Sequence, residues 1–499
     1  MDINLEDKHA LVGDAFGDDK QALEAKGIVI KEKDMLMESL GGMEAPDLKH
    51  NTVSYMKPEK LNPLCRNALA SNDTFICYAV RKSLLRVIDM NYGDKTLLRG
   101  HSHDVLDIDF SKNGNMVLCS VDGGSPETAE EPRVLISQLQ GGESLSKSTG
   151  AGQEELSYIN LAEFEIPGYM VKSHPTCNGC FGVANIAEFG IVACDLDNAG
   201  KVCASAKSGE IKNFTELPIS GESPEENGNI YDLAFSQNGH LVAVTITSFE
   251  SPYTYEAAGV YMWSVKSFVE GYQAGVAPSM MKCTSLEPSA ALFIPAGEAD
   301  GPIVCAKFIS DSQIVVLRDK QGGSSPQLKA TVYSVDSSNL KTPAVAVQSI
   351  TIESSDLTDS SRDQVSSVYE PLLTYAMGVI DAPEGDGSKY LFIRSRVSKY
   401  VIVIAVGGYK SGGAEVATLT HMTLLDLKSP ALSADGAFVQ VKDDTHGIAH
   451  GEAVPHVVLC CYQENGGEQS TIQQFHVQAG ELSPPSAFEV KPAVYWGVP

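Results

Sequence analysis

The sequence lacks an apolar run long enough to cross a membrane as a helix, which takes about 18 to 20 consecutive apolar residues. Its best run, from Tyr400 to Val406, has only the length of a strand. The first residues are acidic and contain no basic segment followed by an apolar one, so they do not resemble a secretory signal or a transit peptide. We therefore expect no membrane association and a location in the cytosol or nucleus.

Positive charge is scarce as well. The chain has 37 Lys and Arg against 64 Asp and Glu, a formal net charge of −27. Because affinity for nucleic-acid phosphates comes mainly from Lys and Arg, we expect no direct binding of nucleic acid by the body of the protein. A local basic cluster is the candidate for binding an acidic partner peptide, although its members are at least as often ordinary exposed positions: Arg81, Lys82, Arg86, Lys95 and Arg99.

Long helical periodicity is missing from Asn51 onward. Short apolar runs alternate there with Gly, Ser, Asn and Pro, which is typical of an all-β fold with many short strands. The sequence also contains no P-loop, no G-x-G-x-x-G after a strand and no H-E-x-x-H. These absences exclude the common nucleotide-binding and zinc-protease motifs.

What the sequence does contain is an internal repeat. VLDIDFSKNGNMVL at 105–118 recurs as IYDLAFSQNGHLVA at 230–243, so that Asp107 corresponds to Asp232 and both copies keep Phe-Ser and Asn-Gly. Alternating apolar residues on either side of Asn-Gly predict two half-buried strands joined by a tight turn. One such unit cannot bury its apolar face alone, so it needs neighbours of the same kind.

Weaker copies bring the number of units to about seven, which is within the range of blades that a propeller can close. The sequence thus predicts an all-β, seven-bladed β-propeller over residues 51–483, with long inter-strand loops. Residues 1–50 are expected to form a flexible arm that contains a helix-compatible segment from Lys20 to Met37, and 484–499 a C-terminal tail. Two tandem β-domains, or a propeller with an irregular blade around 140–190, remain open as alternatives.

The Gly-His pair, the Phe-Ser-x-x-Gly turn and the last apolar strand of the unit resemble the WD40 repeat. In that family a His, a Ser, an Asp and a Trp hydrogen-bond one another inside a blade, and the resemblance assigns the first three roles to His101, Ser120 and Asp122. The Trp position falls at or near Ile136, so this structural blade network would be incomplete. Trp263 stands at a family-like position in the second copy, where Ser rather than Asp follows it.

A narrower resemblance is to the propeller of the enhancer-of-mRNA-decapping scaffolds, the Varicose/Hedls type. RVIDMNYGDKTLLRG at 86–100 is similar to that family, and YMVKSHPTC at 169–177, EPLLTYAMGVID at 370–381 and the segment at 456–477 look similar too. The resemblance implies a non-enzymatic scaffold that binds the decapping enzyme and its activators in cytoplasmic RNA granules (P-bodies). The linker and oligomerising helices that follow the propeller in that family are not in this sequence.

Three residue sets could carry chemistry instead. His101, Ser120 and Asp122 have the residue types of a hydrolytic triad, but no G-x-S-x-G turn surrounds Ser120. His174, Cys177 and Cys180 have a spacing seen in zinc sites, without a good second pair of ligands.

Asp107 and Asp109 alternate along one predicted strand, so their carboxylates are expected on one side of it. Because the second copy keeps only the equivalent of Asp107, we favour a structural role. The prediction is a scaffold with no catalytic residue, metal or cofactor. An adaptor of another pathway (vesicle coat or ubiquitin ligase) is the alternative, and a propeller hydrolase with a channel metal comes third.

Overall fold

A computed structural model describes the backbone of most of the predicted propeller and of short segments at both ends. The described residues are 28–31, 34–37, 48–56, 65–81, 83–111, 117–124, 132–142, 144–145, 147, 155–164, 169–184, 189–193, 214–215, 229–247, 259–274, 292–295, 301–320, 327–353, 375–381, 389–396, 398–411, 414–442, 453–465, 469–478 and 488–489. Within these ranges, no helix has the length and apolar character that crossing a membrane requires.

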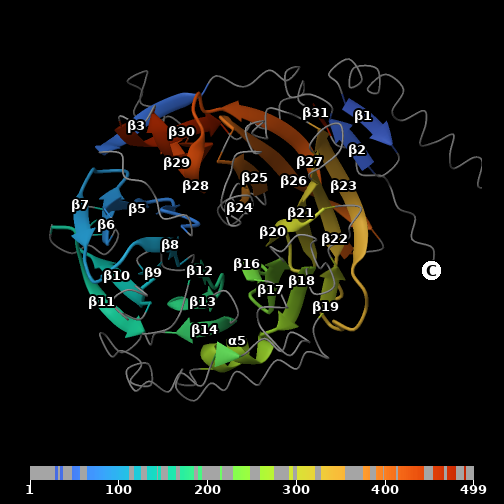
Figure 1. The fold of residues 1–499 in the computed structure, drawn as a ribbon, viewed down its shortest axis with the longest axis horizontal. Helices are drawn as coiled ribbons and strands as arrows, with labels where there is room; N and C mark the ends of the chain where they lie inside the picture. Colours follow the sequence, from blue (N-terminus) through green and yellow to red (C-terminus); the bar gives the residue numbers. More distant parts are fainter. Residues whose placement is uncertain are drawn as a thin grey trace, which may run out of the picture.

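In the described part of the chain the strands form seven sheets arranged as a ring around a central axis (Figure 1). The first four blades follow one another along the chain with four antiparallel strands each. The first holds β4 (Leu69–Ser71), β5 (Phe75–Arg81), β6 (Leu84–Asp89) and β7 (Lys95–Leu98); the second β8 (Val105–Phe110), β9 (Val117–Asp122), β10 (Val134–Gln140) and β11 (Ser157–Phe164); the third β12 (Met170–Ser173), β13 (Cys180–Ala184), β14 (Phe189–Ala193) and β15 (Phe214–Thr215); the fourth β16 (Asn229–Phe235), β17 (Leu241–Thr247), β18 (Gly259–Ser264) and β19 (Leu292–Pro295). The helix α5 (Lys266–Gln273) follows β18.

The last three blades take additional strands from elsewhere in the chain. The fifth holds β20 (Ile303–Phe308), β21 (Gln313–Lys320), β22 (Gln327–Ser334) and β23 (Val345–Glu353), extended by β2 (Asp34–Met37) and β1 (Ile28–Lys31); the sixth holds β24 (Tyr375–Asp381), β25 (Lys389–Ser395), β26 (Tyr400–Ser411) and β27 (Ala414–Asp426), extended by β31 (Phe488–Glu489); the seventh holds β28 (Ala431–Lys442), β29 (Ala453–Asn465), β30 (Gln469–Gln478) and β3 (Lys49–Met56). The predicted all-β, seven-bladed propeller is therefore confirmed.

The seventh blade joins the two ends of the propeller. Its outermost strand is β3, which pairs antiparallel with β30 from Lys49↔His476 to Met56↔Ser470. Figure 1 shows this N-terminal strand, in blue, beside the red strands of the C-terminal part. The hydrogen bonds of one sheet thus hold the first and last parts of the ring together, and β3 covers the outer edge of β30.

The segment from Lys20 to Met37, expected to suit a helix, is extended where the structure describes it. Ile28–Lys31 and Asp34–Met37 form a short antiparallel hairpin, and Asp34–Met37 also runs parallel to β23. The helix expectation is wrong for these residues, because an edge strand of the fifth blade offers them backbone hydrogen bonds.

The apolar side chains of neighbouring sheets pack face to face between the blades. One buried cluster joins the fourth and fifth blades through residues such as Ala243, Val260, Phe308 and Val316, and another joins the sixth and seventh through residues such as Phe392. The innermost strands contact one another in ring order, from β4 through β8, β12, β16, β20 and β24 to β28 and back to β4. Each sheet therefore buries both faces, as the repeat argument requires.

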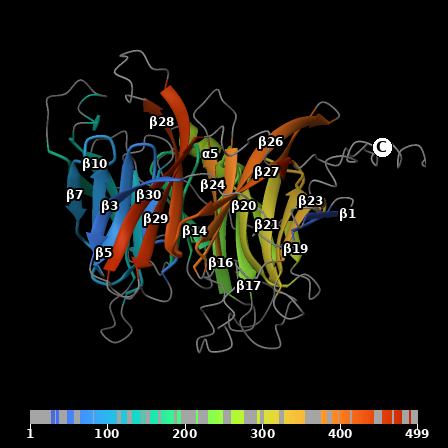
Figure 2. The same ribbon diagram turned by 90° about the horizontal axis from the view of Figure 1, so that it is seen from above.

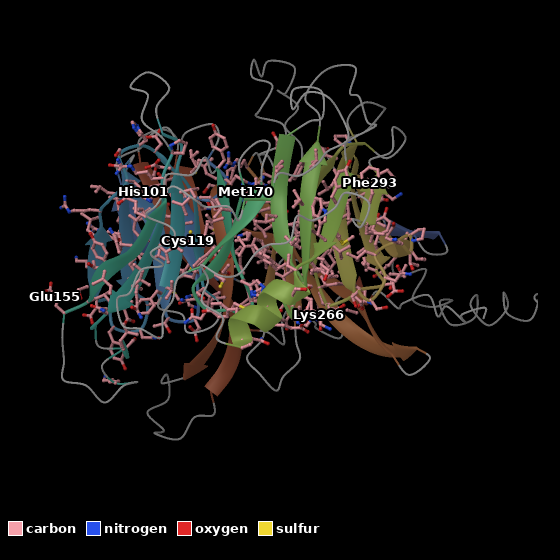
Figure 3. All side chains as sticks on the ribbon, turned by 90° about the horizontal axis from the view of Figure 1, so that it is seen from below. His101, Cys119, Glu155, Met170, Lys266 and Phe293 are labelled. Carbon is pink, nitrogen blue, oxygen red and sulfur yellow. The ribbon has the colours of Figure 1, made fainter. Side chains whose placement is uncertain are left out.

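Two hairpins are much longer than the rest. β26 and β27 stay paired to Ser411↔Ala414, and β28 and β29 to Lys442↔Ala453, with 12 or 13 residues in each strand. Figures 2 and 3 show both hairpins extending beyond the other strands on the same side of the ring. They add two neighbouring projections to one face of the propeller.

Candidate functional site

The inner strands surround a central cavity of about 660 Å³. Its wall takes residues from all seven inner strands and from β25, and it contains five acidic and five basic side chains: Asp107, Asp109, Asp232, Asp381, Asp435, Arg66, Lys172, Lys307, Lys389 and Arg394. In a chain with a net charge of −27, this balance marks the cavity as chemically distinct from the protein as a whole.

Asp107 on β8 and Asp232 on β16 occupy the same place in their blades. In each blade a β-bulge interrupts the pairing with the second strand just before the aspartate. Asp107 Oδ2 accepts a hydrogen bond from the backbone N–H of Val171 at 2.9 Å, and Asp232 Oδ2 accepts one from Ala306 N–H at 3.1 Å. Both donors lie on the inner strand of the next blade, so the repeated aspartate connects adjacent blades.

Asp109 and Asp435 also accept a backbone N–H of the next blade, from a position two residues further along their strands than the one that Asp107 holds in β8. Asp109 Oδ2 accepts from the backbone N–H of Ser173 at 2.7 Å, and Asp435 Oδ2 accepts from Ser71 N–H at 2.6 Å. Asp435 was not among the predicted site residues. In β28 it holds the place that Asp109 holds in β8, two residues after the first residue paired beyond the bulge, so the register of the folded sheet identifies it and the local sequence does not.

Cations from other blades partner these carboxylates to different degrees. Lys307 Nζ lies 2.6 Å from each carboxylate oxygen of Asp232, and Arg66 Nη2 lies 3.9 Å from Asp232 Oδ1. Burial raises the pKa of Asp232, but Lys307 and Arg66 outweigh it and the net pKa is below its ordinary value. Lys172 Nζ is 3.6 Å from Asp109 Oδ2, so it completes a second ionic contact in the wall.

Two carboxyls in the wall are poorly compensated. Burial raises the pKa of Asp107 to about 6, although Lys172 and the N–H of Val171 act in the opposite direction. Burial, together with the charge of Asp109, raises the pKa of Asp435 to about 6 as well. Ionising these two buried groups at neutral pH therefore costs free energy, whereas Lys307 and Arg66 offset that cost for Asp232.

His101, Ser120 and Asp122 meet inside the second blade. His101 Nδ1 lies 3.0 Å from Asp122 Oδ2, and His101 Nε2 lies 2.7 Å from Ser120 Oγ. Asp122 also accepts backbone N–H groups of Arg133 and Gly124, and with His101 these bonds outweigh burial and lower its pKa. Figure 3 places His101 and Cys119 together in this blade.

The same three residues have the hydrogen-bond order of a hydrolytic triad, but a substrate has no access to them. Ser120 is 1% exposed in the middle of β9, between β8 and β10, and Asp122 is fully buried. A catalytic Ser must present its hydroxyl to a substrate next to an oxyanion hole. The contacts therefore favour the structural network over a catalytic triad.

The HPTCNGC segment forms the turn between β12 and β13. His174 Nδ1 accepts the backbone N–H of Cys177 at 3.1 Å, and His174 Nε2 donates to the carbonyl of Gly239 at 3.1 Å, on the fourth blade. Both ring nitrogens are thus engaged, and both cysteines are buried free thiols. The Cys180 thiol hydrogen-bonds the Cys177 sulfur and lowers the Cys177 pKa to about 5, which burial opposes.

The basic residues predicted for partner binding lie on the first blade, away from the cavity. Arg81 ends β5, Arg86 is half-buried on β6, and Lys95 on β7 is exposed, as is Arg99 after it. Lys82 lies outside the described residues. β6 and β7 are adjacent outer strands, so Arg86, Lys95 and Arg99 share the rim of one blade.

The similarities found to known proteins are at the level of solved structures. No protein-family model and no curated protein matches it. Among solved structures it is similar to the β-propeller domain of Cps50 (Swd1) from Myceliophteria thermophila, with 11% identity and a TM-score of 0.42 over 86% of this chain and 100% of that one. It is also similar to Sqt1 from Chaetomium thermophilum, with 12% identity and a TM-score of 0.39 over 87% of this chain and 100% of that one.

Proposed function

We propose that the protein is a non-catalytic scaffold that binds other proteins on the faces and rim of its propeller. The observation that carries the proposal is that the residues of the types used in catalysis are buried or hydrogen-bonded within the ring. The His–Ser–Asp set is sealed inside the second blade, and four cavity carboxylates bond the backbone of the next blade. The reactive groups are thus engaged in holding the ring together, which leaves its outer surfaces for binding.

The two long hairpins support this proposal. Among the described strands, the projecting part of β28 pairs with β29 alone, and β31 covers the outer edge of β27 at His421 and Met422 but not further along the projection. The backbone groups at these uncovered edges can accept an additional strand from a partner peptide. Two neighbouring hairpins on one face would hold two extended segments close together, and tethering raises the local concentration of one partner near the other.

The finer proposal is a role as an mRNA-decapping enhancer in cytoplasmic RNA granules. It rests on the sequence segments that resemble the Varicose/Hedls scaffolds. These map onto β6 and β7, β12, β24 and the β29–β30 hairpin, so they belong to four blades rather than to one local motif. The expected partners are the decapping enzyme and its activators, with no cofactor and no membrane.

Affinity purification of the tagged chain from nuclease-treated lysate, followed by mass spectrometry, tests this assignment. Recovery of the decapping enzyme and its activators supports it, whereas recovery of coat or ubiquitin-ligase subunits favours the alternative adaptor roles. The triple variant R86E/K95E/R99E tests the basic rim of the first blade. Lys266→Glu on α5, which Figure 1 shows on a different part of the ring from β6 and β7, is the control.

A hydrolase with a channel metal remains the second candidate, because carboxylates from several blades do converge on the cavity. Against it, Lys307 and Lys172 contact two of the five carboxylates in the cavity wall. Among the described residues, no group of three or more His, Cys, Asp or Glu is arranged to hold a metal ion. Elemental analysis of the purified protein tests this candidate, and a stoichiometric metal would overturn the scaffold proposal.

A further inference from the structure

Three arginines gather where the inner strands begin. Arg66 lies just before β4, and Arg394 and Arg396 lie at the end of β25. Arg396 donates from Nε to Leu432 O at 3.0 Å and from Nη2 to the carbonyls of Cys65 and Arg66. The side chain of Arg396 therefore ties the sixth blade to the first and seventh through neutral oxygens alone.

Arg394 is the least satisfied member of the cluster. It is 1% exposed, its Nη1 donates to Ala431 O at 3.4 Å, and its Nε has no hydrogen-bond partner among the described residues. Within the described ranges, neither Arg394 nor Arg396 has a carboxylate at ion-pair distance. A buried cation is ordinarily paired with an anion, because burying it alone is costly.

The carboxylate closest to the third arginine, Arg66, is already paired with a lysine. Arg66 Nη2 is 3.9 Å from Asp232, whose two oxygens are both taken by Lys307 at 2.6 Å. Burial and the neighbouring Arg396 and Arg66 lower the pKa of Arg394 to about 9, so its guanidinium stays charged at neutral pH. The cluster thus presents positive charge that the described residues leave uncompensated.

Arg66 and Arg394 both line the central cavity, whose volume of about 660 Å³ lies within the usual range for ligand pockets. A guanidinium presents planar pairs of N–H donors that match the two oxygens of a carboxylate. A phosphate dianion fits less well, because Asp232 and Asp107 share the same cavity and would repel a second negative charge.

We propose that Arg394, assisted by Arg66, forms a subsite for one carboxylate in the central cavity. The carboxylate comes either from a free small carboxylic acid or from an acidic side chain of a bound protein. The second source deepens the proposed scaffold function and rests on it, whereas the first does not. In either case the bound group supplies the counterion that Arg394 lacks.

The test is thermal unfolding of the full chain with increasing sodium acetate, at ionic strength held constant with sodium chloride. We expect a saturable rise in melting temperature, because a ligand that binds the folded state alone stabilises it. Arg394→Gln should weaken the apparent acetate affinity about tenfold or more, as expected for a lost charged hydrogen bond. Arg133→Gln, which breaks an exposed pair with Glu163, is the matched control and should keep the wild-type response.

Arg66→Gln provides a second variant if Arg394→Gln fails to fold, since Arg66 precedes its strand and is partly exposed. Equal acetate responses in the wild type and in either folded variant would overturn the subsite. A stronger response to inorganic phosphate than to acetate would overturn the assignment of a carboxylate.

A blocked octapeptide of glutamate, with the glutamine octapeptide as control, separates the two sources. Displacement of acetate by the glutamate peptide supports an acidic side chain, and its failure in the presence of an acetate response supports a free acid. Partner recovery that is unchanged in Arg394→Gln leaves the scaffold function intact, so the two proposals fail independently.

Discussion

The second and fourth blades come from the two clearest copies of the repeat, yet their interiors differ. Opposite the residue after the shared aspartate, the second blade has Ser120 and the fourth has Val244. Asp122 likewise corresponds to Ile246 by register. The second blade therefore contains a polar network, whereas the fourth is apolar at the same places and contributes to a hydrophobic cluster.

The third strands show the reverse substitution. Trp263 lies opposite Val242, and its counterpart opposite Leu118 is Ser137. Ser137 Oγ donates to Asn160 at 2.8 Å, but Trp263 Nε1 is buried without a hydrogen-bond partner in the described structure. The two copies thus share the bond between blades and differ in what fills each blade. The repeat preserves ring assembly more closely than blade interiors.

The largest expected effect comes from Asp232→Ala. It removes the acceptor for Ala306 N–H and leaves Lys307 buried without its carboxylate, which typically costs about 3–5 kcal/mol. Asp107→Ala in the equivalent position should cost less, about 1–3 kcal/mol, because Asp107 accepts hydrogen bonds but has no lysine at ion-pair distance in the part of the chain that the structure describes. Urea denaturation followed by circular dichroism measures both, and equal losses would contradict the ranking.

His101→Ala tests the polar network of the second blade. It removes the partner of Ser120 Oγ and one of the donors to Asp122 Oδ2, which keeps the backbone N–H of Ser102, and we expect a loss of about 2–3 kcal/mol. Val244→Ser in the fourth blade introduces a hydroxyl into a buried hydrophobic cluster, and it should destabilise by about 1–3 kcal/mol. If His101→Ala is neutral in the same denaturation assay, the network does not stabilise the blade.

The pH dependence of stability should also separate the two aspartates. The pKa of Asp107 is about 6 in the folded state, above its ordinary value of 3.8, so the folded protein binds more protons between these values. Its contribution to stability is present at low pH and is lost as the pH rises from about 4 to about 6.

Asp232 behaves in the opposite way, because its pKa is lowered. Its contribution is present above its ordinary pKa and is lost as the pH falls below that value. Urea denaturation between pH 4 and 6.5 should show that the free energy of unfolding falls less steeply with rising pH in Asp107→Asn than in the wild type. Asp435, whose pKa is also raised, should cause the part of the fall that remains. An unchanged dependence on pH in this variant would show that the pKa of Asp107 is not raised.

The smallest effect is expected for Trp263→Phe. The change removes a buried donor without a partner but also loses apolar contact area, so the free energy of unfolding should change by no more than about 1 kcal/mol. Ser137→Ala at the same register loses the bond to Asn160 and should cost about 1 kcal/mol. A loss above 3 kcal/mol for Trp263→Phe would indicate that the indole N–H has a partner.

Much of the fold was predictable because the repeat reports local strand pairing. Alternating apolar residues around Asn-Gly predicted the β16–β17 hairpin, and the recurrence of Asp107 as Asp232 indicated a structural role that agrees with its bonds to the next blade. The β1–β2 hairpin and the pairing of β2 with β23 were missed, since four-residue edge strands carry little periodicity.

The cavity was less predictable than the blades. Asp435 bonds Ser71 across 364 residues of sequence, and Arg66 reaches Asp232 on a blade three places further round the ring. These residues become neighbours only when the ring closes, so no local sequence pattern predicts the contacts between them. For His174 the sequence spacing suggested a ligand, whereas in the folded chain Nε2 donates to the carbonyl of Gly239 on the next blade and Nδ1 accepts the backbone N–H of Cys177.

The placement of β3 in the seventh blade has a consequence for biosynthesis. The strand leaves the ribosome well before its partner β30, which ends at Gln478. At translation rates of roughly 5–20 residues per second, β3 waits about 20–80 s for that partner. During this time its backbone edge is open to other nascent chains, so a chaperone that shields residues 49–56 would raise the yield of closed rings.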